Sequence, residues 1–149
     1  MGRWRDGGAV LRVGGANGTP APVSVSVPVS APASVSVPAS VPVSVPLEIA
    51  ASYRARTRGL LGRDGIAGAL LLTPAGSVHT FRMRFAIDVA YLDRNLDVIA
   101  LTTMVPGRLG LPRPRSRHVL EAEAGAMAGW GLRVGTRVEV EPRPDGAGT

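Results

Sequence analysis

The polar side chains that could do chemistry gather in one stretch, SVHTFRMRFAIDVAYLDRN, which spans residues 77–95. His79 is the residue there that could bind a ligand or act as a general base. Asp88 is the single charge within the apolar pattern of residues 85–92, and a buried carboxylate needs hydrogen bonds or a cation. Asp88 has two candidate roles. It either accepts hydrogen bonds from the 77–84 segment and fixes its path, which we favour, or it orients His79 for catalysis.

Other catalytic and metal-binding patterns have little support. The chain contains no cysteine, so thiolate nucleophiles, thiolate metal sites and disulfides are excluded. Its two histidines, His79 and His118, have neither His-x-His nor His-Glu-x-x-His spacing, and we expect no metal site and no cofactor. Ser77, His79 and Asp88 could be drawn as a triad, but no Gly-x-Ser-x-Gly elbow surrounds the serine. These patterns favour a protein that is not an enzyme.

A basic loop lies between Asp97 and Glu121, where the only charged residues are Arg108, Arg113, Arg115 and Arg117. Fixed positive charge of this kind could bind a phosphate, a polyanion or an acidic partner. Nucleic-acid binding would also require aromatic side chains for base stacking, and this loop has none. All 17 basic residues of the chain are arginine, which a bias in codon composition explains better than a nucleic-acid surface. We therefore favour a solvated basic loop, with anion binding second and nucleic-acid binding disfavoured.

Residues 47–142 have the pattern of one small α+β domain. Hydrophobic periodicity predicts strands over residues 46–52, 68–74, 85–93, 97–105, 118–123 and 136–141, with short helices over 53–63 and 124–132. Ser52 can cap the first of these helices. The economical arrangement is a strongly curved, mostly antiparallel β-sheet that forms a half-open barrel.

Residues 1–46 are predicted to be a disordered low-complexity tail. From residue 20 to residue 46, Ser or Pro alternates with Val or Ala, and the run contains seven prolines. Proline cannot donate a hydrogen bond to a strand ladder, so we expect an extended, polyproline-II-like segment. A selected spacer and a neutrally expanded repeat both stay open. Residues 143–149 are predicted to be a flexible C-terminus.

The first 20 residues contain no apolar run of the ~7–15 residues that a signal peptide needs. No segment approaches the ~18 consecutive apolar residues of a membrane span. The sequence as written therefore predicts a soluble, cytoplasmic and monomeric chain, and export would require a different start.

Five motifs in a fixed order carry a resemblance to a known family: RTRGLLGR, ALLLTP, SVHTFRMRFAIDVAYLDRN, HVLEAEAG and GLRVGTRVEV. Residues 47–141 resemble the domain-of-unknown-function 192 family, also called uncharacterised protein family 0127. The resemblance implies a compact α+β domain with a strongly curved sheet, and it brings no established activity. The positions that match the family pattern are Arg58-Gly59-Leu60, His79-Thr80-Phe81, Met83, Asp88, Leu120-Glu121 and Gly125.

The chain departs from the family pattern at two places. Many relatives have a tryptophan beside the methionine, where this chain has Phe81-Arg82-Met83. Relatives with the His-Thr version often place a cysteine just before it, and here the preceding PAGS has none. The second departure argues against thiol chemistry in this member.

The sequence predicts a non-catalytic binding or accessory module, in an envelope-related context, for a small anionic or sugar-like ligand or a protein partner. The candidate ligand-binding residues are Arg58, His79, Thr80, Arg82, Asp88 and Glu121. Two alternatives stay open: an enzyme of unknown reaction that uses His79 oriented by Asp88, and a weak polyanion or nucleic-acid binder that uses the arginine loop 108–117.

Overall fold

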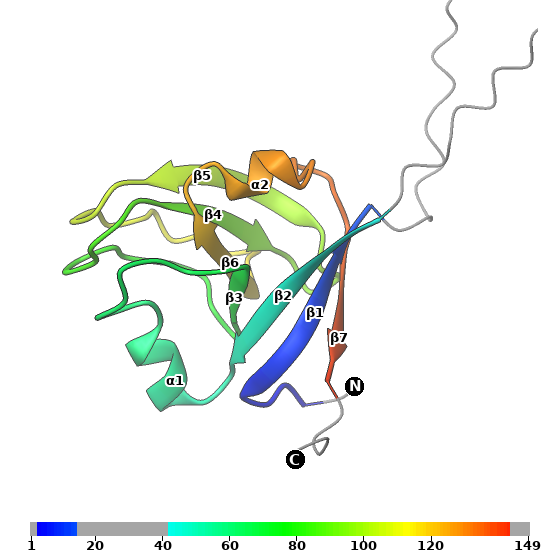
Figure 1. Ribbon diagram of the computed structural model, residues 1–149, viewed down its shortest axis with the longest axis horizontal. Helices are drawn as coiled ribbons and strands as arrows, with labels where there is room; N and C mark the ends of the chain where they lie inside the picture. The colour runs from blue at the N-terminus through cyan, green and yellow to red at the C-terminus, as the bar shows by residue number, and fades with distance from the viewer. Residues whose placement is uncertain (1–2, 15–41, 144–149) are drawn as a thin grey trace, which may run out of the picture.

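The computed structural model describes residues 3–14 and 42–143, which form one seven-stranded sheet with two short helices (Figure 1). The elements in chain order are β1 (Gly7–Val13), β2 (Val43–Ala50), α1 (Tyr53–Arg58), β3 (Ala69–Leu72), β4 (Ile87–Leu92), β5 (Val98–Met104), β6 (His118–Glu123), α2 (Ala126–Gly129) and β7 (Val138–Pro142). The strand order is β5-β4-β6-β3-β2-β1-β7, in which β2 and β3 run parallel and the other neighbours run antiparallel. This confirms the expected α+β fold with a curved, mostly antiparallel sheet, which is not closed into a barrel.

Each face of the sheet carries its own apolar cluster, because successive side chains of a strand point to opposite faces. On the face that we call inner, Leu92 of β4 and Leu120 of β6 pack with β1, β2, β7 and α2. On the outer face, Val89 and Val119 pack with loop residues, among them Val78. The central strands β3 and β4 are buried along their whole length. Because both faces of the sheet are covered, a functional surface must lie on the segments that cover them.

β1 shows that the predicted N-terminal tail boundary is wrong. Residues 7–13, which were assigned to the tail, form a strand between β2 and β7, and β2 begins at Val43 rather than near residue 47. The physical reason is the period of two in GGAVLRV, which places Ala9, Leu11 and Val13 in the inner core. The greater part of the predicted low-complexity tail, residues 15–41, lies outside the described residues, as does the predicted flexible C-terminus after residue 143.

Pro46 explains how a proline-rich segment can enter the sheet. It lies within β2 opposite Val10 of β1, although proline usually argues against an interior strand. The pairing of β2 with β3 begins only at the next position, where Leu47 lies opposite Ala69. Pro46 thus stands where β2 is still unpaired on one side, which is the position that a sheet tolerates.

Local signals define the two ends of α1. The hydroxyl of Ser52 accepts a hydrogen bond from the amide of Ala55 (3.1 Å), which confirms Ser52 as the cap of α1. The helix ends at Arg58 instead of near residue 63, because Gly59 takes a left-handed φ of 45°. Both helices are short, and none in the described part of the chain is long and apolar enough to cross a membrane.

Candidate binding surface over the outer face of the sheet

Two loop segments, 77–84 and 105–113, run antiparallel to each other and form what we call the loop ribbon. Its cross-strand pairs are Val78 with Gly110, His79 with Leu109, and Thr80 with Arg108. The ribbon lies on the side of the molecule away from β1 and β7 (Figure 1). Val78 points down into the outer cluster, so alternation along the segment turns His79 and Phe81 outward.

Thr80 holds the two segments of the loop ribbon together. Its hydroxyl donates to the carbonyl of Val105 at 2.7 Å and accepts from the amide of Arg108 at 2.9 Å. Its carbonyl accepts from the amide of Gly107 at 2.7 Å. The side chain is fully buried, so the hydroxyl of this predicted site residue is used inside the protein and sets the path of both loops.

The outward face of the loop ribbon is aromatic and aliphatic. The rings of His79 and Phe81 stack with centroids 5.2 Å apart and planes 21° from parallel. Phe81 is 46% exposed, Leu109 71% and Leu111 76%. Alternation places all four on the same side of the ribbon, so they form one exposed apolar surface rather than scattered positions.

Arginines border this apolar surface. Arg82 takes a left-handed φ of 61°, in a turn closed by the amide of Met83 donating to the carbonyl of Thr80 at 3.2 Å. Arg82 and Arg108 are exposed, and within the described residues neither makes a side-chain hydrogen bond or an ion pair.

In the predicted arginine loop 108–117, some arginine side chains contact other residues of the protein and others do not. The guanidinium of Arg113 lies 4.9 Å from the centroid of the Tyr91 ring, and that of Arg117 donates to the carbonyl of Pro114 at 3.1 Å. Both line a shallow cleft of about 470 Å³ beside the loop ribbon. Arg115, like Arg108, is exposed and lacks an acidic partner among the residues that the structure places.

Asp88 is buried as predicted, but its donors differ from those expected. Its Oδ1 accepts from the hydroxyl of Thr103 at 2.7 Å, and its Oδ2 accepts from the amides of Gly125 (2.9 Å) and Met127 (3.2 Å). None of these donors belongs to the 77–84 segment. The reason is strand alternation, because Asp88 shares the inner face with Leu92 while the loop ribbon covers the outer face. Asp88 therefore fixes the turn into α2 and does not reach His79.

Glu121 is a carboxyl group buried in apolar surroundings under the outer face. It is 4% exposed, and it lies opposite Leu70 of β3 and Val89 of β4. None of the side-chain hydrogen bonds between described residues involves Glu121. Burial raises the pKa of the Glu121 carboxyl to about 7. A group of this kind titrates near neutral pH, and either form is poorly solvated.

The predicted site residues therefore do not form one constellation. The loop ribbon brings His79, Thr80 and Arg82 together, while Asp88 lies on the other face of β4. Glu121 lies on the outer face but is covered. Arg58 ends α1 and is exposed, with no side-chain hydrogen bond to any residue that the structure describes.

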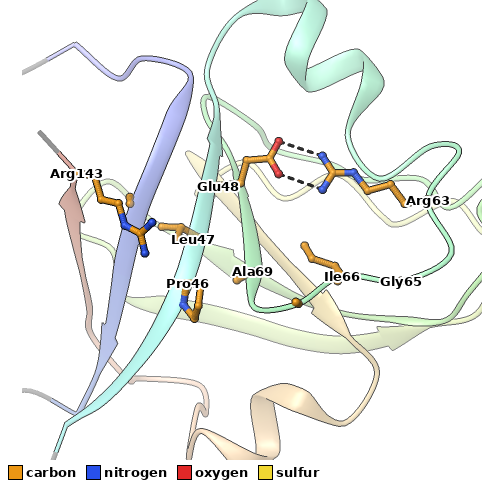
Figure 2. Close-up of a pocket in the computed structure, with 10 residues that line it drawn as sticks. Pro46, Leu47, Glu48, Arg63, Gly65, Ile66, Ala69 and Arg143 are labelled. Atoms are coloured by element: carbon orange, nitrogen blue, oxygen red, sulfur yellow. Dashed lines mark hydrogen bonds and ion pairs between the residues drawn. The ribbon is translucent and has the colours of Figure 1, made fainter. Parts of the chain in front are cut away.

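A hollow of about 240 Å³ lies elsewhere, where β2 meets the loop before β3. Figure 2 shows Glu48 and Arg63 joined by two hydrogen bonds on one side of it, each of 3.0 Å, and Arg143 on the other side. The Glu48 carboxylate offsets the charge of Arg63.

Sequence reasoning missed the buried polar contacts of His118. Its Nδ1 lies 2.6 Å from the hydroxyl of Thr73, and its ring meets the edge of Trp4 at a centroid distance of 5.4 Å. Burial lowers the pKa of His118. Thr73 and Trp4 lie 45 and 114 positions away from His118 along the chain, and no local pattern signals such contacts. They help to anchor the N-terminal segment before β1.

The fold and its basic, partly apolar loop surface define a small α+β domain with a curved sheet that is not closed into a barrel. The model of the DUF192 family, described as Uncharacterized ACR, COG1430, matches residues 35–140. The chain belongs to this family, which confirms the resemblance read from its motifs.

Relatives with the same family name occur in archaea. The UPF0127 protein PH1112 of Pyrococcus horikoshii is 32% identical over 84 residues, which cover 53% of this chain and 73% of that protein. The UPF0127 protein PYRAB11210 of Pyrococcus abyssi is 29% identical over 98 residues, which cover 62% and 84%. These names state no activity.

Two solved structures share the fold. A protein of Sinorhizobium meliloti 1021, R01717, named as a candidate transcription regulator, superposes with a TM-score of 0.66 over 93% of this chain and 98% of its own, at 17% identity. A protein of unknown function from Novosphingobium aromaticivorans DSM 12444 gives a TM-score of 0.63 over 87% and 83%, also at 17% identity. At this identity the likeness concerns the fold alone.

Proposed function

We propose that this chain is a non-catalytic binding module that uses the outward face of the loop ribbon to bind an anionic partner. The observation that carries this proposal is the exposed His79–Phe81 stack, which lies beside Arg82 and Arg108 with no acidic partner for either in the described residues. Guanidinium groups that are not already paired bind carboxylates and phosphates through two parallel hydrogen bonds. Loops on a rigid sheet are also the usual place for recognition groups.

Binding is better supported than catalysis around His79. A catalytic histidine needs an orienting partner within hydrogen-bond reach. Asp88 is the predicted orienter, but it lies on the other face of β4. Its two carboxylate oxygens accept hydrogen bonds from Thr103 and from the turn into α2. The groups beside His79 supply positive charge and apolar area instead, which suits recognition.

Charge variants of the loop ribbon test the proposal. Binding of inorganic phosphate, citrate and a fluorescent octaglutamate peptide is measured at low and high salt. We expect the double variant Arg82→Gln/Arg108→Gln to weaken the binding of the probes by about 30-fold at low salt, since each lost charge near an anion is worth ~1 kcal/mol. The matched control is Arg94→Gln, which removes an exposed arginine from the turn between β4 and β5, away from the ribbon.

Two outcomes would contradict the proposal. The first is that none of the three probes binds the wild-type chain at low salt. The second is that the Arg94→Gln control weakens binding as much as the double variant does, because the attraction would then come from net charge rather than from this surface.

A further inference from the structure

We propose that the anionic partner of the loop ribbon is the surface of an anionic lipid bilayer, into which Phe81, Leu109 and Leu111 insert. This inference rests on the proposed function, because it names the partner of the same surface. The apolar side chains enter the boundary between headgroups and acyl chains, and the neighbouring arginines bind lipid phosphates. The chain binds at the periphery of the bilayer through two loops rather than through a helix.

The shape of the apolar surface favours a bilayer. Leu109 and Leu111 are 71% and 76% exposed, so no wall of a groove shelters them. A bound peptide gains affinity by lying in a groove or along a free strand edge, and the outward face of the loop ribbon provides neither. Projecting leucine and phenylalanine side chains instead match the apolar groups with which peripheral proteins enter a membrane interface.

The charge distribution points to the same partner. Residues 77–86 and 105–117 contain six arginines and no acidic residue: Arg82, Arg84, Arg108, Arg113, Arg115 and Arg117. Their charge equals the formal net charge of +6 of the whole chain, so the remainder is neutral overall. A basic residue near an anionic bilayer strengthens binding by about fivefold. The resulting field turns the loop ribbon, rather than β1 and β7, toward a negative surface.

Apolar and basic residues alternate closely along the loop ribbon. Phe81 precedes Arg82, and Arg108 precedes Leu109. When an apolar side chain enters below the headgroups, an adjacent guanidinium reaches the level of the phosphates. Arg84, which is paired with Asp64 at 2.9 Å, contributes less than the arginines without acidic partners.

The test is cosedimentation of the full chain with vesicles of phosphatidylcholine alone or of phosphatidylcholine mixed with phosphatidylglycerol. We expect binding to the mixed vesicles, little binding to neutral ones, and a steep loss of binding as salt is raised. The double variant Leu109→Ser/Leu111→Ser should weaken vesicle binding by about tenfold or more, because it removes the inserting side chains. Its melting temperature should stay unchanged, since both side chains are exposed.

The matched control is Val134→Ser, which removes an apolar side chain that is 63% exposed in the turn before β7. It should bind the mixed vesicles like the wild type. Equal binding by the wild type and the double leucine variant would overturn the inference, because adsorption would then be purely electrostatic. Dimerisation of the wild type that the double leucine variant abolishes would also overturn it, since a second copy would then cover the surface.

The vesicle experiment separates this inference from the proposed function. If the octaglutamate peptide binds through Arg82 and Arg108 while the mixed vesicles do not bind, the membrane inference fails and the proposed function stands. If neither probe depends on the loop ribbon, both fail.

Discussion

The buried carboxyl of Glu121 predicts an unusual dependence of stability on pH. Its pKa in the folded chain is about 7, against an ordinary value of 4.5. The folded chain therefore holds one more proton than the unfolded chain between these two values. The free energy of unfolding should fall as pH rises through this window. A difference of roughly 2.5 pKa units at ~1.4 kcal/mol each amounts to about 3 kcal/mol.

The variant Glu121→Gln isolates this contribution, because glutamine has a similar shape and no charge at any pH. We expect its stability relative to the wild type to increase by about 3 kcal/mol between about pH 4.5 and about pH 8. The assay is urea unfolding of both proteins at several pH values across this range. Comparing the two proteins also removes the effect of His118, whose lowered pKa acts in the opposite direction by favouring the folded state as pH rises.

The neighbours of Glu121 determine which result would refute this prediction. Tyr91 on β4 is the titratable neighbour that senses its charge, and burial raises the pKa of Tyr91 while Arg113 above the ring opposes that shift. A difference between the two proteins that stays constant from acid to alkaline pH would refute the account. Such a result would mean that Glu121 is ionised in the folded chain and compensated by a cation.

Four further variants test individual contacts and strand pairings. Asp88→Ala should lower the free energy of unfolding by about 2–3 kcal/mol, because it leaves buried donors without an acceptor; a loss under ~0.5 kcal/mol in urea unfolding would contradict this. Deleting residues 1–14 should leave the chain unable to give a cooperative thermal transition, since β7 loses its sheet partner. Replacing residues 14–42 by Asn-Gly should preserve that transition, because Val13 and Val43 already lie opposite each other and a two-residue turn can join them. His79→Ala should weaken probe binding while changing stability by less than ~0.5 kcal/mol, and a larger loss in the same unfolding assay would make the His79–Phe81 stack structural.

Strand periodicity was sufficient to predict most of the sheet. The six strands expected from alternation are present, and the helix cap at Ser52 and the burial of Asp88 followed from local patterns. β1 is the exception, because Ala9, Leu11 and Val13 carry the same alternation but lie before the proline-rich run, among the residues predicted to be tail. A strand tolerates proline at a position that is paired with a neighbouring strand on one side only, as Pro46 shows.

The candidate binding surface could be predicted only in part, because its geometry depends on distant contacts. Sequence pattern selected His79 and Arg82, which lie on the loop ribbon. It did not pair the 78–80 segment with residues 108–110, since that pairing joins two irregular loops about 30 positions apart. It also could not tell that Glu121 is covered, because alternation assigns a side chain to a face but does not say what packs over that face.

The most direct test of the loop ribbon as the binding surface is a map of backbone amide chemical-shift changes in the full chain. The spectrum is recorded on addition of whichever anionic probe binds most tightly. We predict that the largest changes occur in residues 77–84 and 105–113, with little change around Glu48, Arg63 and Arg143. Changes concentrated at that second group, in the hollow of Figure 2, with an unaltered loop ribbon would contradict the account.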